Sequence, residues 1–581
     1  MNDVGHGEHA PLHVSFVELV LVHGMGRQRP RETLLRWAEP LVRRIDWLAA
    51  DGASARLVAV DLDVDQDPRV VVATQVTDDS GARRLVEVTI TEARWAEAFP
   101  GLGRGATFVW GLSFLRRTIG RLGGFIARLL VQMMLDVVAL PGWAAARTPV
   151  PRTVWAGLLL PLIVATAVTT VAALVVLGLA LGALLLSGYA ALILIGPVLL
   201  IPGVARVLGP IVELVVEFIG DAAAWTRRPV RAAAMRRVVE EALEEAEGRL
   251  DRAVAANGGE GRLVVLGHSQ GASIAADVLF NRPDGHMPPR VDALITVGAA
   301  VTLLGRARWS GPAQDLPAME NPVVGWSRRE PPVRWSNFWG VFDPFPSGPI
   351  STTAVNRLRR WRESFERTTP RNPAPGPEER PVHNTAWPFT EHLAYAGNIP
   401  QVVDPIARLL LDLPVPAADA HASLRRIRHS RGVRALGLQR MLVLALSATV
   451  LLLGPLLLGP VEWTPSALTD LLGENAAWIV AAVAVAVLGL WINEALWRQH
   501  AARIAWRRVP HPPRLWLGGL VYRAILLAML TASAALSWPG AATVVLAGAI
   551  SVVLLAAPHV GRLPRVAPPR RVLPRQPARR D

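Results

Sequence analysis

The stretch LVVLGHSQGASIAADVL, residues 263–279, constrains the fold of this chain more than any other. An apolar run ends in the pentapeptide GHSQG at 267–271, and a helix-like stretch of small residues follows. A strand that turns this sharply into a helix needs glycine at both ends of the turn, because a side chain at Gly267 or Gly271 would collide with a neighbouring strand or helix. The stretch therefore predicts a buried strand, a tight turn with Ser269 at its tip, and a helix.

Strand-like and helix-like segments alternate on both sides of this stretch. Strands are expected at about 14–22, 54–63, 68–76, 83–91, 262–266, 291–301 and 333–342, and helices at 31–50, 228–256 and directly after 271. This alternation is typical of an α/β fold, in which a mostly parallel sheet carries helices on both faces.

Two blocks of the chain are apolar enough to suggest a membrane. The whole chain is 51% hydrophobic with a mean hydropathy of +0.32. No charge occurs between Arg152 and Arg206, and this run fits two spans of about 20 residues with a turn near Gly178 to Gly188. Further spans are expected at about 440–460, 476–496, 515–537 and 541–558. A helical transmembrane region of about six spans is therefore predicted.

Changes in hydrophobicity and charge along the sequence divide the chain into five parts. Residues 1–107 and 227–420 are expected to form one soluble domain in two pieces. Residues 108–226 hold the first membrane hairpin, residues 421–560 four more spans, and residues 561–581 a basic tail that we expect to be disordered. The helix ahead of the hairpin mixes arginines with an apolar face, so it lies either in the membrane interface or on the soluble domain.

The charges suggest an orientation. Basic residues outnumber acidic ones by 61 to 47, and all of them are arginine. Arginines crowd the links at 498–514 and 562–580, whereas the loop at 461–475 carries only acids, so the positive-inside rule places the soluble pieces in the cytoplasm of a bacterial-type cell. No signal peptide is visible at the start of the sequence. Because the arginines flank apolar runs, we expect a membrane and no nucleic acid as a partner.

The serine at the tip of the turn suggests nucleophilic chemistry. A serine hydroxyl needs a base and the base needs an orienting acid, and the expected chain order is serine, acid, histidine. Asp343 fits the acid because it follows an apolar strand in a proline-flanked turn. Asp61 and Asp63 also end a strand, but they precede the serine and fit that order badly.

Two histidines follow Asp343 as candidate bases. His392 opens a helix-like stretch after a plausible last strand, and we favour it over His383. The sequence has no cysteine, which excludes disulfides and thiol catalysis. It also shows no metal-binding pattern and no phosphate loop, so no cofactor and no metal are expected.

These features together resemble the α/β-hydrolase fold in its lipase and esterase branch. The resemblance spans residues 10–107 and 228–412. It rests on His23-Gly24 after an early strand, the Gly267-His268-Ser269-Gln270-Gly271 turn, Asp343 in FDPFPSG, and His392 followed by Tyr395 and Asn398.

The resemblance implies a Ser269-His392-Asp343 triad and an oxyanion hole. The oxyanion donors would be the backbone amides of Met25 and Gln270. Supporting roles are expected for His23, Gly24, Gly267, His268 and Gly271, with His268 shaping the site or the substrate pocket and not acting as the base.

The expected function is a membrane-embedded serine hydrolase that cleaves a carboxylic ester, such as a lipid acyl ester. A thioesterase or an acyltransferase would use the same residues. A second class stays open, in which the hydrolase-like domain only binds a ligand or partner. A transporter is disfavoured, because the spans carry few ionisable residues beyond Arg523 and Glu494.

Overall fold

The computed structural model describes part of the chain. It covers most of residues 13–98, 138–186, 221–304, 322–345 and 377–415, with short gaps, and a few residues at 127–135, 350, 479–487 and 573–574. The chain separates into two compact units, one made of residues 1–118, 188–425 and 568–581 and the other of residues 119–187 and 426–567.

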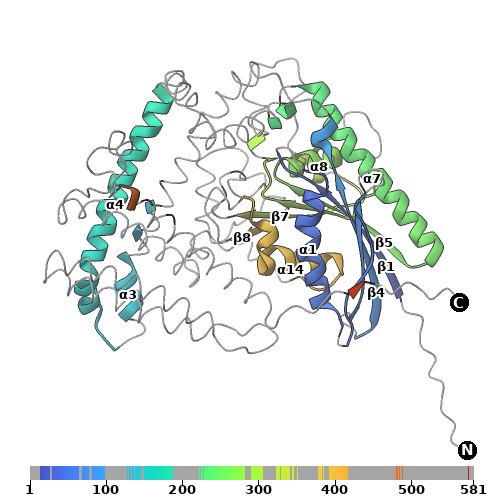
Figure 1. Ribbon diagram of the computed structural model, residues 1–581, viewed down its shortest axis with the longest axis horizontal. Coiled ribbons are helices and arrows are strands. Elements are labelled where there is room, and N and C mark those ends of the chain that lie inside the picture. The colour runs from blue at the N-terminus through green and yellow to red at the C-terminus, as the bar shows by residue number, and fades with distance from the viewer. Residues whose placement is uncertain are drawn as a thin grey trace, which may run out of the picture. The chain divides into compact units, whose positions relative to one another are not determined.

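The first unit is built on a nine-stranded sheet with the order β8-β7-β6-β5-β1-β4-β3-β2-β9 (Figure 1). The strands are β1 His13–Val22, β2 Arg56–Asp61, β3 Arg69–Thr77, β4 Arg83–Ala93, β5 Glu260–His268, β6 Ala293–Val297, β7 Arg334–Gly340, β8 Glu378–Val382 and the two-residue β9 Leu573–Pro574. Neighbours from β4 to β8 pair in parallel, while β3 is antiparallel to both β2 and β4. The expected mostly parallel sheet is confirmed.

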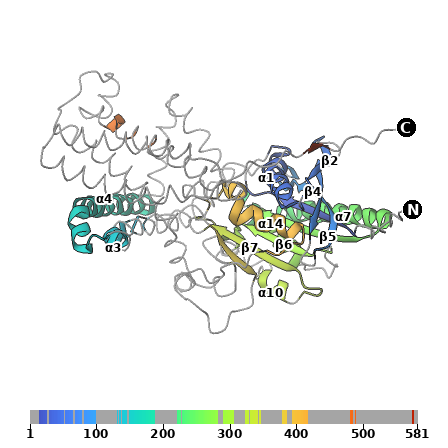
Figure 2. The same cartoon turned by 90° about the horizontal axis from the view of Figure 1, so that it is seen from below.

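Helices cover both faces of this sheet, as the alternation of segments predicts (Figures 1 and 2). The helices of this unit are α1 Glu32–Leu48, η2 Trp95–Ala98, α7 Pro229–Asn257, α8 Gln270–Phe280, α10 Pro322–Ser327, η3 Tyr395–Gly397, η4 Ile399–Val403 and α14 Asp404–Leu410. Helices α7 and α8 pack on one face and α1 and α14 on the other.

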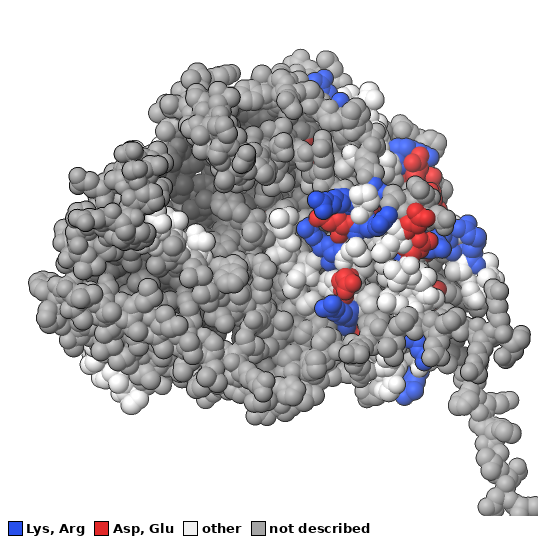
Figure 3. Space-filling model, viewed as in Figure 1, with Lys and Arg blue, Asp and Glu red and all other residues white. Residues whose placement is uncertain are grey.

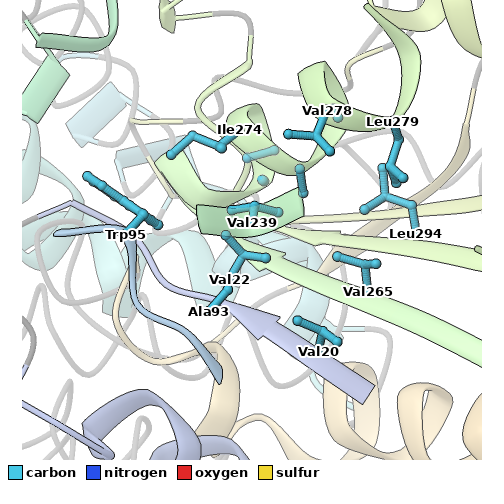
Figure 4. Close-up of a cluster of buried hydrophobic side chains, with 14 of the residues drawn as sticks. Val20, Val22, Ala93, Trp95, Val239, Val265, Ile274, Val278, Leu279 and Leu294 are labelled. Atoms are coloured by element: carbon cyan, nitrogen blue, oxygen red, sulfur yellow. The ribbon is translucent and has the colours of Figure 1, made fainter. Parts of the chain in front are cut away.

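Strand β1 shows why two layers of helices form. Successive side chains of a strand point to opposite faces. Val20 and Val22 pack with α7 and α8 in one core, and Leu19 and Leu21 pack with α1 and α14 in the other. Figure 4 shows the first of these cores, in which valines of β1 and β5 meet the side chains of α7 and α8. The two cores fix β1 and β5 side by side at the centre of the sheet.

Charged side chains on the described surface are mixed in sign. Figure 3 shows basic and acidic groups next to one another on one face of the molecule. In α1, Arg43 lies 3.4 Å from Glu39 one turn away, and in α7 Arg237 lies 2.8 Å from Glu241. Exposed pairs of this kind contribute little to stability, and they are typical of a solvated helix face.

The second unit contains α3 Leu140–Ala145 and α4 Arg152–Leu186. Helix α4 is 35 residues long and continues through Gly178, so the turn expected near Gly178 to Gly188 does not begin at Gly178. A glycine costs a helix about 1 kcal/mol relative to alanine, which weakens a helix without ending it. In the part of the chain whose side chains are also described, no helix is long and apolar enough to cross a membrane. The four later candidate spans lie outside the described residues, apart from a few positions at 479–487.

Candidate active site

Ser269 occupies the turn between β5 and α8 in a conformation that few side chains adopt. Its backbone angles are φ 55° and ψ −118°, and non-glycine residues reach positive φ only at a cost of about 1–3 kcal/mol. The turn is held from the end of β6. The Ser269 amide donates to the Val297 carbonyl over 3.0 Å, and the Ser269 carbonyl accepts from the Ala300 amide over 3.0 Å.

The two glycines of the turn are required for the reason that the sequence suggests. A Cβ on Gly267 would lie 2.6 Å from the Cα of Ala272 in α8. A Cβ on Gly271 would collide with the carbonyl oxygens of Val22 and His23 at the end of β1. The helix can therefore start directly at the sheet only because both positions lack a side chain.

The structure brings Ser269, His392 and Asp343 together. The Ser269 hydroxyl donates to His392 Nε2 over 2.8 Å, and His392 Nδ1 donates to Asp343 Oδ2 over 2.8 Å. All three residues are buried, with exposed fractions of 2%, 4% and 2%. Asp343 follows β7 and His392 follows β8, so both reach the serine from the carboxyl ends of neighbouring parallel strands.

The Asp343 carboxylate has two further donors. Tyr395 Oη donates to Asp343 Oδ2 over 2.7 Å, and the Phe345 amide donates to Oδ1 over 2.9 Å. The tyrosine oxygen in turn accepts from the Gly340 amide over 2.6 Å. Sequence reasoning gave Tyr395 no role of its own. Two features of the sequence could have pointed to Tyr395: it lies three residues after His392, and the chain has only 3 tyrosines.

Gly298 leaves room for the His392 and Tyr395 rings, and the sequence analysis missed it. Its φ of +56° suits glycine. A Cβ there would lie 3.2 Å from His392 Nδ1 and 2.8 Å from Tyr395 Cε2. A side chain at this position would therefore crowd both the Tyr395 ring and the His392 imidazole. The signal was a glycine directly after an apolar strand.

On the other side of the serine, the loop after β1 contacts the turn. A Cβ on Gly24 would lie 2.9 Å from Ser269 Cβ, so the backbone passes directly against the serine. The Gln270 amide is the first of α8, and the first N–H groups of a helix have no acceptor within it. The residue before Met25 therefore lies against Ser269 on one side, and Gln270 follows Ser269 at the start of α8.

His23 orients the peptide that joins Gly24 to Met25. A backbone amide can only donate, so the Ala96 N–H 3.3 Å from His23 Nε2 makes that nitrogen the acceptor. His23 Nδ1 then carries the proton and donates to the Gly24 carbonyl over 2.7 Å. The ring stacks on Trp95 with centroids 4.6 Å apart. Because the C=O and N–H of a trans peptide point in opposite directions, the Met25 N–H is turned away from His23.

His268 contacts the main chain of His392. Its Nε2 donates to the His392 carbonyl over 3.0 Å, and the two ring centroids are 5.0 Å apart. Burial, and then repulsion from His392, lower the pKa of His268 to about 3. His268 is therefore a neutral group beside the site, and it does not contact the serine hydroxyl.

The alternative acids and the alternative base from the sequence are not among the described residues that the structure brings to Ser269. Asp61 ends β2 and Asp63 follows it, and β2 lies four strands away from β5 in the sheet, so neither joins the group around Ser269. His383 lies outside the described residues.

Comparison with models of protein families, with characterised proteins and with solved structures finds no match to this chain.

Proposed function

We propose that this chain is a serine hydrolase of the α/β-hydrolase type that cleaves carboxylic esters through Ser269, His392 and Asp343. The observation that carries the proposal is the pair of 2.8 Å hydrogen bonds that link serine to histidine and histidine to aspartate. The positive φ of Ser269 at the start of α8 supports it, because this strained turn presents a nucleophile at the end of a strand.

In the first step, Ser269 Oγ attacks the ester carbonyl carbon while its proton passes to His392 Nε2. Asp343 accepts the Nδ1 hydrogen bond and stabilises the imidazolium that forms. The carbonyl oxygen gains negative charge, and the amides of Met25 and Gln270 donate to it. Burial of the three side chains strengthens these interactions, because little water competes for them.

In the second step, the tetrahedral intermediate collapses and the bond from the acyl carbon to the alkoxy oxygen breaks. His392 gives its proton to the departing alcohol, and Ser269 keeps the acyl group. Water then attacks the acyl-enzyme, loses a proton to His392, and releases the acid as that proton returns to Oγ. A thioester substrate or an acceptor alcohol would use the same groups, so a thioesterase or an acyltransferase is the same proposal with another leaving group or acceptor.

The proposed substrate is a lipid acyl ester, and the proposed setting is a membrane. Both come from the apolar blocks within 108–226 and 421–560, since an enzyme held at a membrane meets acyl chains without extracting them into water.

A fluorophosphonate probe tests the reaction. The wild-type protein should react with the probe and hydrolyse a short p-nitrophenyl ester, and the Ser269→Ala variant should do neither. The expected loss of turnover is on the order of 10⁴ to 10⁶. A folded Ser269→Ala protein that still takes the probe would favour the alternative of a non-catalytic binding domain.

Cysteine labelling tests the membrane and its orientation, because the native chain has no cysteine. Thr469→Cys, in the acidic loop, should react with an impermeant maleimide added to intact cells. Ala256→Cys, at an exposed position near the end of α7, should react only after lysis. Labelling of Ala256→Cys in intact cells would reverse the proposed orientation and place the chemistry outside the cell.

A further inference from the structure

We propose that His268, the residue directly before the nucleophile, is a positioning residue that holds the main chain of the base His392 in register with Ser269. The inference rests on the proposed function. It adds a role for a side chain that takes no part in the proton transfers described above.

The hydrogen bond between the two histidines fixes the proton on His268. A carbonyl oxygen only accepts, so the 3.0 Å contact from His268 Nε2 to the His392 carbonyl requires a proton on Nε2. The neutral ring then has a bare Nδ1. A Cβ on Gly24 would lie only 3.1 Å from that nitrogen, so the ring is enclosed by the oxyanion loop on one side and by His392 on the other.

The position of His268 in the chain makes this bond useful. His268 and Ser269 are consecutive. One peptide bond therefore joins the residue that holds the His392 main chain to the residue whose hydroxyl donates to the His392 imidazole. The His392 imidazole is bonded through its side chain to Ser269 and Asp343. Its main chain is tied to the turn itself by His268. A shift of the turn therefore carries the base with it and preserves the 2.8 Å contact.

A neutral group suits this place better than a charged one. The His268 and His392 rings lie 5.0 Å apart, and His392 becomes positive during each proton transfer. A second positive charge at that distance would oppose the imidazolium. Burial keeps the pKa of His268 near 3, so the anchor stays uncharged at working pH. Glutamine and asparagine are neutral replacements that can show which of the two His268 nitrogens matters, because their amide nitrogens take the places of Nε2 and Nδ1, respectively.

The experiment compares His268→Gln with His268→Asn in the full chain. The amide nitrogen of glutamine can occupy the place of Nε2 and donate to the His392 carbonyl, whereas that of asparagine lies near the place of Nδ1 and cannot reach it. We expect His268→Gln to keep kcat within about threefold of wild type and His268→Asn to lose roughly 10- to 100-fold, because an error of about 1 Å in the placement of a catalytic group costs that much. KM for the p-nitrophenyl ester should stay within about twofold in both, since the anchor contacts no substrate.

Several outcomes would overturn the inference. Equal kcat values for the two variants, when both have melting temperatures close to wild type, would show that the donor is not needed. A loss that appears in KM and leaves kcat unchanged would assign His268 to the substrate pocket. Failure of the wild-type chain to hydrolyse the ester or take the probe would defeat the proposed function itself, and this inference with it.

A second measurement covers the case in which neither variant folds. Nitrogen-15 NMR of the wild-type protein should show one histidine that stays neutral with its proton on Nε2 down to about pH 4, consistent with the pKa near 3. His23 should show the opposite tautomer, with its proton on Nδ1. Absence of an acid-resistant Nε2–H histidine would overturn the proposal without any substitution.

Discussion

The two sides of Ser269 are built in different ways. On the base side, His392 and Asp343 reach the serine through side chains that come from two different strand ends. On the proposed oxyanion side, the proposed donors are the backbone amides of Met25 and Gln270, next to Gly24, which lies against the serine. One side therefore depends on which side chains are present, and the other depends on where the backbone runs.

This difference decides which substitutions matter. A side chain with a unique chemical role has no substitute, whereas a backbone amide survives any substitution that leaves the path of the chain unchanged. The base side should be sensitive at His392 and Asp343 themselves. The oxyanion side should be sensitive at Gly24, where a side chain would displace the loop, and tolerant at Met25.

The largest effects are expected on the base side. His392→Ala and Asp343→Ala should each lower turnover on the order of 10³- to 10⁶-fold, because the serine loses its base or the base loses its orienting acid. His392→Ala should still fold, since Tyr395 and the Phe345 amide continue to donate to the buried Asp343 carboxylate. His383→Ala is the control and should be mild. If His383→Ala abolished ester hydrolysis while His392→Ala did not, the base would be His383.

A smaller loss of rate is expected on the oxyanion side, and it should separate from stability. Gly24→Ala places a Cβ 2.9 Å from Ser269 Cβ, so the loop must move and the Met25 amide is displaced. Loss of one oxyanion donor costs about 10²- to 10³-fold in kcat. Met25→Ala keeps the amide but removes a buried side chain, so it should lower the melting temperature and leave kcat nearly unchanged. Equal losses of kcat would show that the methionine side chain matters and the amide does not.

The outer contacts of the base side should have a still smaller effect. Tyr395→Phe removes one donor to Asp343 Oδ2, while His392 and the Phe345 amide still hold the carboxylate. The expected loss of kcat is roughly tenfold, the equivalent of one hydrogen bond to a charged group. The Gly340 amide also loses its acceptor, so the melting temperature should fall. A loss as large as that of Asp343→Ala would mean that the tyrosine hydroxyl takes part in the reaction directly.

The turn and the sheet were predictable from the sequence because their signals are local. The strand that became β5 and the helix that became α8 follow from an apolar run, two glycines and a small-residue stretch within 263–279. The choice of Asp343 and His392 also used local cues, namely strand ends and the order along the chain. The structure brings both residues to Ser269.

The contacts that complete the site were not predictable in this way. The bond from His268 to His392 joins residues 124 positions apart, and that from Tyr395 to Asp343 joins residues 52 apart. Such contacts depend on how the carboxyl ends of the strands and the segments that follow them meet, and no periodicity in the sequence records this. At Gly178 a local signal suggested the start of a turn, and the structure instead has a helix that continues through this residue to Leu186.

The smallest effect on kcat, within about threefold, is expected for His268→Gln, and this variant should instead change the stability of the fold in acid. In the folded protein the pKa of His268 is about 3, lowered by burial and by the charges of His392, Arg36 and His23, whereas an unfolded chain has the ordinary value of about 6.5. Between these values the unfolded state binds a proton that the folded state does not, so stability is undiminished above about pH 6.5 and falls as the pH drops toward 3. At most one proton is bound by the unfolded state and not by the folded state, so the free energy of unfolding changes by at most about 1.4 kcal/mol for each pH unit. His268→Gln removes this group, so its melting temperature should fall less steeply than that of wild type between pH 6.5 and pH 4. Melting curves that run parallel over this range would show that His268 takes up its proton in the folded protein as readily as in the unfolded chain.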